Sequence, residues 1–123
     1  MHRVFLALCG FSGVVAVGAG AFGAHALRST RSPELLAAFQ TGVLYHLVHT
    51  LALAGIAFAT AQGMGRYFTI AGWLFVAGIA LFSGSLYSLA ITGIRGFGAI
   101  TPVGGLCLLA GWLTWAIAAL QKR

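Results

Sequence analysis

Two histidines three residues apart, His46 and His49, are the side chains of this sequence best suited to chemistry. An imidazole can transfer protons near neutral pH, ligate a metal, or donate and accept hydrogen bonds. Tyr45 lies four residues before His49, so the two side chains can touch on a helix. At about 100° per residue, these three side chains share a sector of about 100°, which predicts one polar face on an otherwise apolar helix. Further polar residues extend it: Gln40, Thr41 and Thr50.

Four interpretations of this face compete. Metal or haem ligation requires ligands that converge from at least two helices. His46 and His49 share one helix, and His25 lies at the membrane edge, far from their depth. We therefore expect no cofactor and no metal. A proton or solute path suits histidines inside a membrane, but no acidic relay partner accompanies them. A small-molecule or lipid pocket remains open. The favoured interpretation is an internal network in which every polar group is hydrogen-bonded.

Hydroxyl groups in a later apolar segment are the expected partners of this face. The candidate network or pocket consists of Tyr45, His46, His49, Ser83 and Tyr87. We expect Tyr45 and His49 to point inward and bond to groups on another helix, with the serine and tyrosine cluster as the favoured partners. Serine in such a segment is a source of helix-to-helix hydrogen bonds rather than a nucleophile, because no carboxylate lies nearby to complete a triad.

Four apolar segments must position these residues, at about 4–24, 36–61, 68–92 and 100–120. None contains Asp, Glu, Lys or Arg, and each is long enough to cross a hydrocarbon core of about 30 Å. Hydrophobic residues make up 60% of the chain and charged residues 7%, which leaves too few polar groups to cover a soluble domain. The sequence predicts an all-α integral membrane bundle of four transmembrane helices, forming one domain over residues 1–123.

The ends of the predicted helices carry recognisable signals. Ser32–Glu34 reads as an N-cap, a proline at the first helical position and an acid in the first turn. Thr101–Pro102 repeats this signal for the fourth helix. Gly63 and Gly93 occupy positions typical of C-terminal caps. The connections are short, so consecutive helices should be antiparallel neighbours.

Small residues recur every fourth position in the first and third segments, a spacing that lets helices approach closely in a membrane. The string 18–23 also matches G-x-G-x-x-G, but it lies inside an apolar helix and not at a strand-to-helix turn, so packing is the better interpretation. A leucine at position 20 or 84 should therefore disrupt folding. The expected helix-packing residues are Ser12, Ala16, Gly20, Gly84, Ser88, Gly104 and Gly105.

The N-terminal segment has two interpretations. Arg3 and the Ala24–Ala26 string resemble parts of a secretory signal peptide. The apolar run is longer than the usual 7–15 residues of such a peptide and carries a packing stripe, so we expect it to remain as the first helix. Cys9 and Cys107 lie in separate apolar runs and are expected to be packed side chains rather than a disulfide or metal site.

The net charge of +6 comes from basic residues that flank the apolar segments, which indicates contact with membrane lipids and not with nucleic acid. Four spans place both termini on one side. That side carries Arg3, Arg66, Lys122 and Arg123, against Arg28, Arg31 and Arg95 on the other. The slight excess predicts cytoplasmic termini.

Four strings in order resemble one family: GAGAFGAHAL (18–27), FQTGVLYHLVHTLAL (39–53), LFSGSLY (81–87) and TPVGG followed by GW (101–112). The chain is similar to the uncharacterised small four-helix membrane proteins that include bacterial YgdD and that resemble eukaryotic transmembrane protein 256. The resemblance implies a multi-pass protein of the bacterial inner, or plasma, membrane, with no reaction assigned. The motif positions it singles out are His25, Tyr45, His49, Ser83, Tyr87, Pro102, Gly104 and Gly105.

The sequence favours a non-enzymatic structural or accessory component that packs with itself or within a larger membrane complex. The alternative is a small-molecule or lipid binder, or a transporter, that uses the His/Tyr face. A membrane enzyme is the weakest hypothesis because the chain has a single acidic residue. A water-filled cavity touching His46 and His49 would favour the alternative, and a dry, fully bonded interior would favour the first interpretation.

Overall fold

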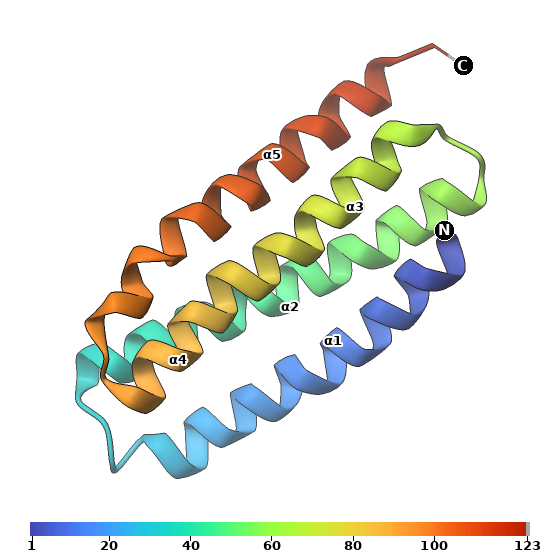
Figure 1. Ribbon diagram of the computed structural model, residues 1–123. Helices are drawn as coiled ribbons and strands as arrows, with labels where there is room; N and C mark the ends of the chain where they lie inside the picture. The colour runs from blue at the N-terminus through green and yellow to red at the C-terminus, as the bar shows by residue number, and fades with distance from the viewer. Residues whose placement is uncertain (123) are drawn as a thin grey trace.

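The computed structural model describes residues 1–122, so the predicted membrane-flanking Arg123 lies outside the described part. Four long helical segments run up and down in sequence order (Figure 1). Each is long and apolar enough to cross a membrane. The elements are α1 (His2–Phe22), η1 (Gly23–Leu27), α2 (Pro33–Ala61), α3 (Arg66–Gly78), η2 (Ile79–Ser83), α4 (Gly84–Thr92), η3 (Arg95–Ala99) and α5 (Thr101–Leu120). The described residues contain no strand, and the chain is an all-α membrane bundle, as predicted.

The first and third segments each include one π-helical turn, η1 and η2, which the sequence did not predict. These turns continue the neighbouring α-helix without a break, so α1 with η1 covers His2–Leu27, and α3, η2 and α4 together cover Arg66–Thr92. The helices are longer than the apolar runs alone suggested. The links between them are correspondingly short, at 28–32, 62–65 and 93–94.

The structure confirms the predicted capping residues at three of four helix ends. The Ser32 hydroxyl accepts a hydrogen bond from the Leu35 N–H at 3.3 Å, as expected of an N-cap. Gly63 and Gly93 follow their helices with φ of 69° and 71°, the left-handed conformation that glycine adopts freely. The expectation for Thr101 was wrong: Ile100 is the N-cap, and the Thr101 hydroxyl instead bonds to the Ser85 hydroxyl at 2.6 Å. A bond to a neighbouring helix competes with the capping role.

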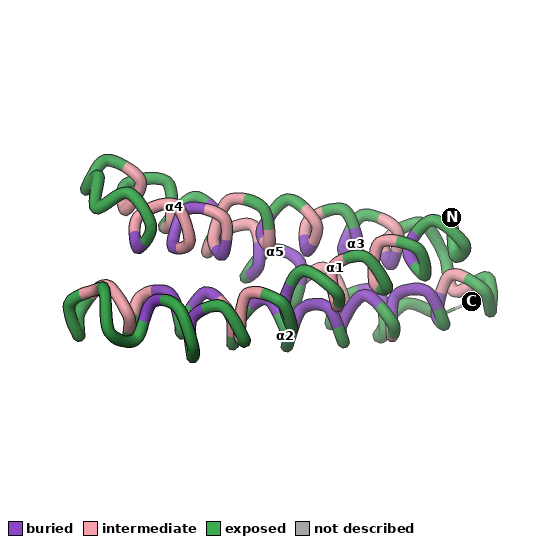
Figure 2. The backbone as a smooth tube through the Cα atoms, turned by 90° about the horizontal axis from the view of Figure 1, so that it is seen from below, coloured by how far each residue is buried: buried purple, intermediate pink, exposed green. Residues whose placement is uncertain are grey.

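The second helix forms the centre of the bundle. Half of its most apolar stretch is buried, against 11% for the first segment and 22% for the last. The first segment packs along α2, while α3 packs along α5 (Figure 1). Buried positions accordingly follow one side of α2 for most of its length (Figure 2). The outer faces of α1 and α5 are left to lipid or to other proteins.

Aromatic rings inserted over glycines hold the helices together. The Phe5 ring lies over Gly72, the Phe75 ring over Gly111, and both phenylalanines are fully buried. They belong to an apolar cluster near the chain termini, while Leu27, Phe39 and Ala90 form a smaller cluster at the opposite end. The glycines leave space for the rings, so the contact area of a large side chain is gained without separating the helix backbones.

The predicted packing glycines behave differently from one another. A Cβ on Gly104 would overlap the backbone of Phe82, so α5 and η2 make a true backbone approach there. A Cβ on Gly20 or Gly105 would make ordinary contacts, at 3.4 Å from Val43 and 3.7 Å from Phe82. At Gly84 the expectation of close approach was wrong, because nothing lies within 4 Å of the Cβ position. Four-residue spacing identifies a stripe, but the rotation of the helix decides which stripe faces a neighbour.

The remaining packing candidates also divide. Ala16 on α1 is fully buried, as expected of a helix-packing residue. The Ser88 hydroxyl donates to the Gly84 carbonyl of its own helix at 2.8 Å, so it does not bond across helices. Ser12 turns out to belong to the polar centre of the bundle rather than to a simple packing stripe.

Candidate functional site

His46 lies at the centre of a hydrogen-bond chain that joins three helices. Its Nδ1 is 2.8 Å from the Tyr87 hydroxyl on α4, and its Nε2 is 2.9 Å from the Ser12 hydroxyl on α1. Ser12 in turn lies 2.6 Å from the Thr50 hydroxyl, which donates to the His46 carbonyl at 2.8 Å. Only 4% of the His46 surface is exposed. The second helix is thereby tied to the first and third segments.

The direction of each bond in this chain follows from counting protons. Thr50 spends its one hydroxyl proton on the His46 carbonyl, so it accepts from Ser12. Ser12 has then spent its proton as well, and must accept from the N–H at Nε2 of His46. A neutral imidazole with its proton on Nε2 leaves Nδ1 free to accept from the Tyr87 hydroxyl. The four side chains satisfy one another when His46 is uncharged.

His49 forms a separate pair with the last helix. Its Nδ1 lies 2.6 Å from the Tyr45 carbonyl, which can only accept, and its Nε2 lies 2.9 Å from the indole N–H of Trp112, which can only donate. His49 is therefore also uncharged, with its proton on Nδ1. His49 does point inward and bond to another helix, but the favoured serine and tyrosine cluster is not its partner. The partner comes from α5, because this side of α2 faces α5 and not α4.

Two other predicted members of the network have different roles. Ser83 is buried, and its hydroxyl donates to the Gly42 carbonyl at 2.7 Å, which links η2 to the backbone of α2. Tyr45 is 42% exposed, and no hydrogen bond of its hydroxyl occurs among the described residues. Its ring packs against the Phe82 ring at an interplanar angle of 36°, with ring centroids 4.6 Å apart. The expectation that Tyr45 points inward and bonds across the bundle was wrong.

Trp112 and Ser12 are the network residues whose roles were not predicted from the sequence. Trp112 reads equally well as an interfacial anchor, because tryptophan favours membrane boundaries. The indole N–H can only donate a hydrogen bond, so it suits an unprotonated imidazole nitrogen buried in the bundle. Ser12 reads as one member of a small-residue stripe, although its hydroxyl also needed a partner. Each could have been found by asking which polar groups in the spans still lacked a partner.

Among the remaining candidates, only Cys9 touches this network. His25 is exposed in η1 at the far end of the first segment. The Cys9 thiol donates to the Thr50 carbonyl at 3.3 Å, and Cys107 is a half-buried free thiol on α5. Within residues 1–122, no three His, Cys, Asp or Glu side chains come together as metal ligands would.

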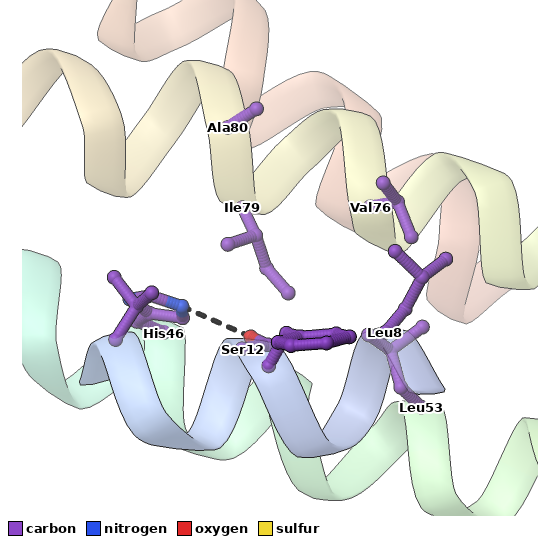
Figure 3. A pocket seen from close by; sticks show the side chains of 9 residues that line it. Leu8, Ser12, His46, Leu53, Val76, Ile79 and Ala80 are labelled. Carbon is purple, nitrogen blue, oxygen red and sulfur yellow. Dashed lines mark hydrogen bonds between the residues drawn. The ribbon is translucent and has the colours of Figure 1, made fainter. Parts of the chain in front are cut away.

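A groove of about 270 Å³ opens beside the network, between α1, α2 and the α3–η2 segment (Figure 3). The Ser12–His46 hydrogen bond lies in its wall, and Ile79 points into it from the opposite helix. The other lining side chains are apolar: Leu8, Phe11, Val15, Leu53, Val76 and Ala80. Both polar groups in the wall already have partners, so the groove presents an almost wholly apolar surface.

Comparison with known proteins agrees with this architecture. Residues 19–105 match the family described as protein of unknown function DUF423. The chain is 45% identical to the UPF0382 membrane protein YwdK of Bacillus subtilis, over 97% of the chain and 98% of the relative. It is 40% identical to a UPF0382 membrane protein of Staphylococcus epidermidis, over 97% of each chain. It is 39% identical to the UPF0382 inner membrane protein YgdD of Escherichia coli, over 98% of the chain and 92% of the relative. No solved structure matches it. The chain belongs to the UPF0382 (DUF423) family of membrane proteins.

Proposed function

We propose that this membrane protein is a non-enzymatic structural or accessory component of the bacterial inner membrane, which associates with itself or with a larger membrane complex. The observation that carries the proposal is the closed polar centre of the bundle. Both buried histidines use both ring nitrogens, and no buried side-chain nitrogen or oxygen among the described residues lacks a partner. A catalytic or transport site needs groups that are free to bind a substrate, whereas this interior is arranged for rigidity.

The outer helices support the association. Val14 and Val17 on α1 are 73% and 66% exposed, and Leu109 and Leu113 on α5 are similarly uncovered. Hydrocarbon can cover such surfaces alone, but Gly10 and Gly18 on α1 leave open space that a second backbone could approach. The proposed orientation places both termini in the cytoplasm, on the charge bias of the flanking residues.

The test is the mass of the protein extracted with its native lipids. We expect a particle larger than a single chain, and we expect an exposed tryptophan on α1, in Val14→Trp, to reduce its size. Leu51→Trp is the matched control, because Leu51 on α2 is as exposed as Val14 but lies outside the two outer helices. A particle containing one chain and no other protein would contradict the proposal, as would a small molecule that co-purifies with the wild-type chain and is lost from His46→Ala.

A second candidate function is lipid binding, favoured by the groove beside His46. The occupant we propose is the acyl chain of a phospholipid. Water is disfavoured because it needs two to four polar partners, and the groove walls are apolar. A whole helix, which is about 10–12 Å across, does not fit inside a groove of about 270 Å³. Ala80→Trp should fill the groove and reduce the lipid retained in native mass spectrometry, while Leu109→Trp on the outside of α5 should not. Equal lipid retention in both variants would remove this candidate.

A further inference from the structure

The only acidic residue of the chain lines a hollow together with an arginine. Glu34 in the first turn of α2 and Arg95 at the start of η3 both border a hollow of about 400 Å³. The other lining residues are Ser32, Leu35, Ala38, Leu89 and Gly93. Within residues 1–122 neither charged side chain forms a hydrogen bond or an ion pair. Two opposite charges therefore face one space without a protein partner.

The hollow lies at the end of the bundle where the helix ends meet the membrane boundary. Ser32 and Glu34 mark the start of α2, and Gly93 is the left-handed residue that ends α4. Leu35, Ala38 and Leu89 continue from this polar mouth toward the apolar interior. The hollow is thus polar at the depth of lipid headgroups and apolar where the glycerol and acyl chains of a lipid begin.

The neighbouring Arg31 is not available to neutralise Glu34. Its Nε donates to the Ala90 carbonyl at 2.9 Å and its Nη2 to the Ile91 carbonyl at 2.8 Å. These bonds fix the guanidinium against the C-terminal end of α4, where cations are favoured. The positive charge that remains free to meet a ligand in the hollow is that of Arg95.

We propose that this hollow binds the headgroup of a zwitterionic phospholipid that carries a primary ammonium, with Glu34 accepting from the ammonium and Arg95 donating to the phosphate. A purely anionic headgroup would gain the same contact with Arg95 but would be repelled by the Glu34 carboxylate. A headgroup with a quaternary ammonium has no N–H to donate to Glu34. The pairing of one carboxylate with one guanidinium therefore selects a headgroup that carries both a negative phosphate and a positive ammonium with N–H donors.

The test is competition between lipids of different headgroup and identical acyl chains. The purified protein is placed in mixed micelles with equal amounts of phosphatidylethanolamine and phosphatidylglycerol, and retained lipid is read by native mass spectrometry. We expect a preference of about fivefold for phosphatidylethanolamine, since an exposed ion pair contributes up to about 1 kcal/mol. Soluble phosphoethanolamine should not displace the lipid, because it leaves the apolar floor of the hollow empty.

Three variants complete the design. Glu34→Gln should abolish the preference, and Arg95→Gln should reduce retention of both lipids. Arg28→Gln is the matched control, since it removes an exposed arginine at the same end that does not line the hollow. Equal retention of the two lipids by the wild-type chain, a preference for phosphatidylglycerol, or an unchanged preference in Glu34→Gln would overturn the proposal. Displacement by soluble phosphoethanolamine would show a site for the free headgroup and would overturn the lipid as its ligand.

Discussion

Trp112 on α5 donates its indole N–H to Nε2 of His49 on α2, at a distance of 2.9 Å. The two residues are 63 positions apart in sequence, and their rings also meet edge to face with centroids 5.8 Å apart. The bond joins the last helix to the central one at a depth where lipid provides no hydrogen-bonding groups. It therefore contributes to positioning α5, which has few other polar contacts with α2.

The first prediction concerns the stability of this pair. Trp112→Phe should lower the free energy of unfolding by about 1–3 kcal/mol, because the buried His49 Nε2 loses its donor. His49→Leu should destabilise by a similar amount, since the indole N–H is left unpaired. The double variant should lose less than the sum of the two single effects. Reversible unfolding in mixed detergent measures all three.

Trp73→Phe provides the control for these measurements. Trp73 lies on α3, is 44% exposed, and forms no indole hydrogen bond among the described residues. Its replacement should cost less than that of Trp112. Strictly additive effects of Trp112→Phe and His49→Leu would show that the bond does not couple the helices.

The second prediction concerns the protons on the two histidines. His46 should carry its proton on Nε2 and His49 on Nδ1, both in the neutral form, because of the donors and acceptors that surround each ring. Nitrogen-15 NMR of histidine-labelled protein at neutral pH distinguishes the tautomers. Tyr87→Phe removes the donor to Nδ1 of His46 and should shift only the His46 signals.

A charged imidazolium at either position would contradict this assignment, as would the same tautomer at both. His25 is the internal control. It is exposed in η1 and is no part of the network, so its signals should be unchanged in Tyr87→Phe.

The membrane architecture could be predicted because it depends on local properties of the sequence. Four charge-free runs separated by short basic links specify four antiparallel helices, whatever their contacts. Ser32 and Gly93 mark helix ends through bonds made within a few residues, so their roles were also readable. The π-helical turn at Ile79–Ser83 was not, because it depends on how η2 meets α2 and α5.

The site could be predicted only in part, for a related reason. The polar face of α2 follows from the spacing of His46 and His49, but the partner of each depends on helix rotation. His46 meets Tyr87, which the sequence offered, while His49 meets Trp112. The sequence of a span shows which donors and acceptors are available, but it does not show which neighbouring helix each one faces. Tyr45 illustrates the limit, since it is 42% exposed and its hydroxyl has no hydrogen bond among the described residues.

The third prediction contrasts two glycines. Gly104→Ala should destabilise the protein by about 1–3 kcal/mol, because its Cβ would overlap the Phe82 backbone, which cannot move aside. Gly84→Ala should be neutral or stabilise by up to about 1 kcal/mol, since its Cβ would meet open space and alanine favours a helix over glycine. Thermal unfolding in detergent gives the sign of each effect. Equal destabilisation by both variants would mean that the third segment is rotated relative to this structure.

The last prediction is topological: both termini lie on the same, cytoplasmic, side of the membrane. The start of α1 and the end of α5 lie at one end of the bundle, beside the link between α2 and α3 (Figure 1). In a background with Cys9→Ala and Cys107→Ala, cysteines introduced at His2 and Lys122 should be protected from an impermeant thiol reagent in intact cells. A cysteine at Thr30, at the opposite end of the bundle, should react. Reaction of His2→Cys and Lys122→Cys from opposite faces would refute the four-span architecture. Reaction of both from outside, with Thr30→Cys protected, would preserve the architecture and reverse the orientation.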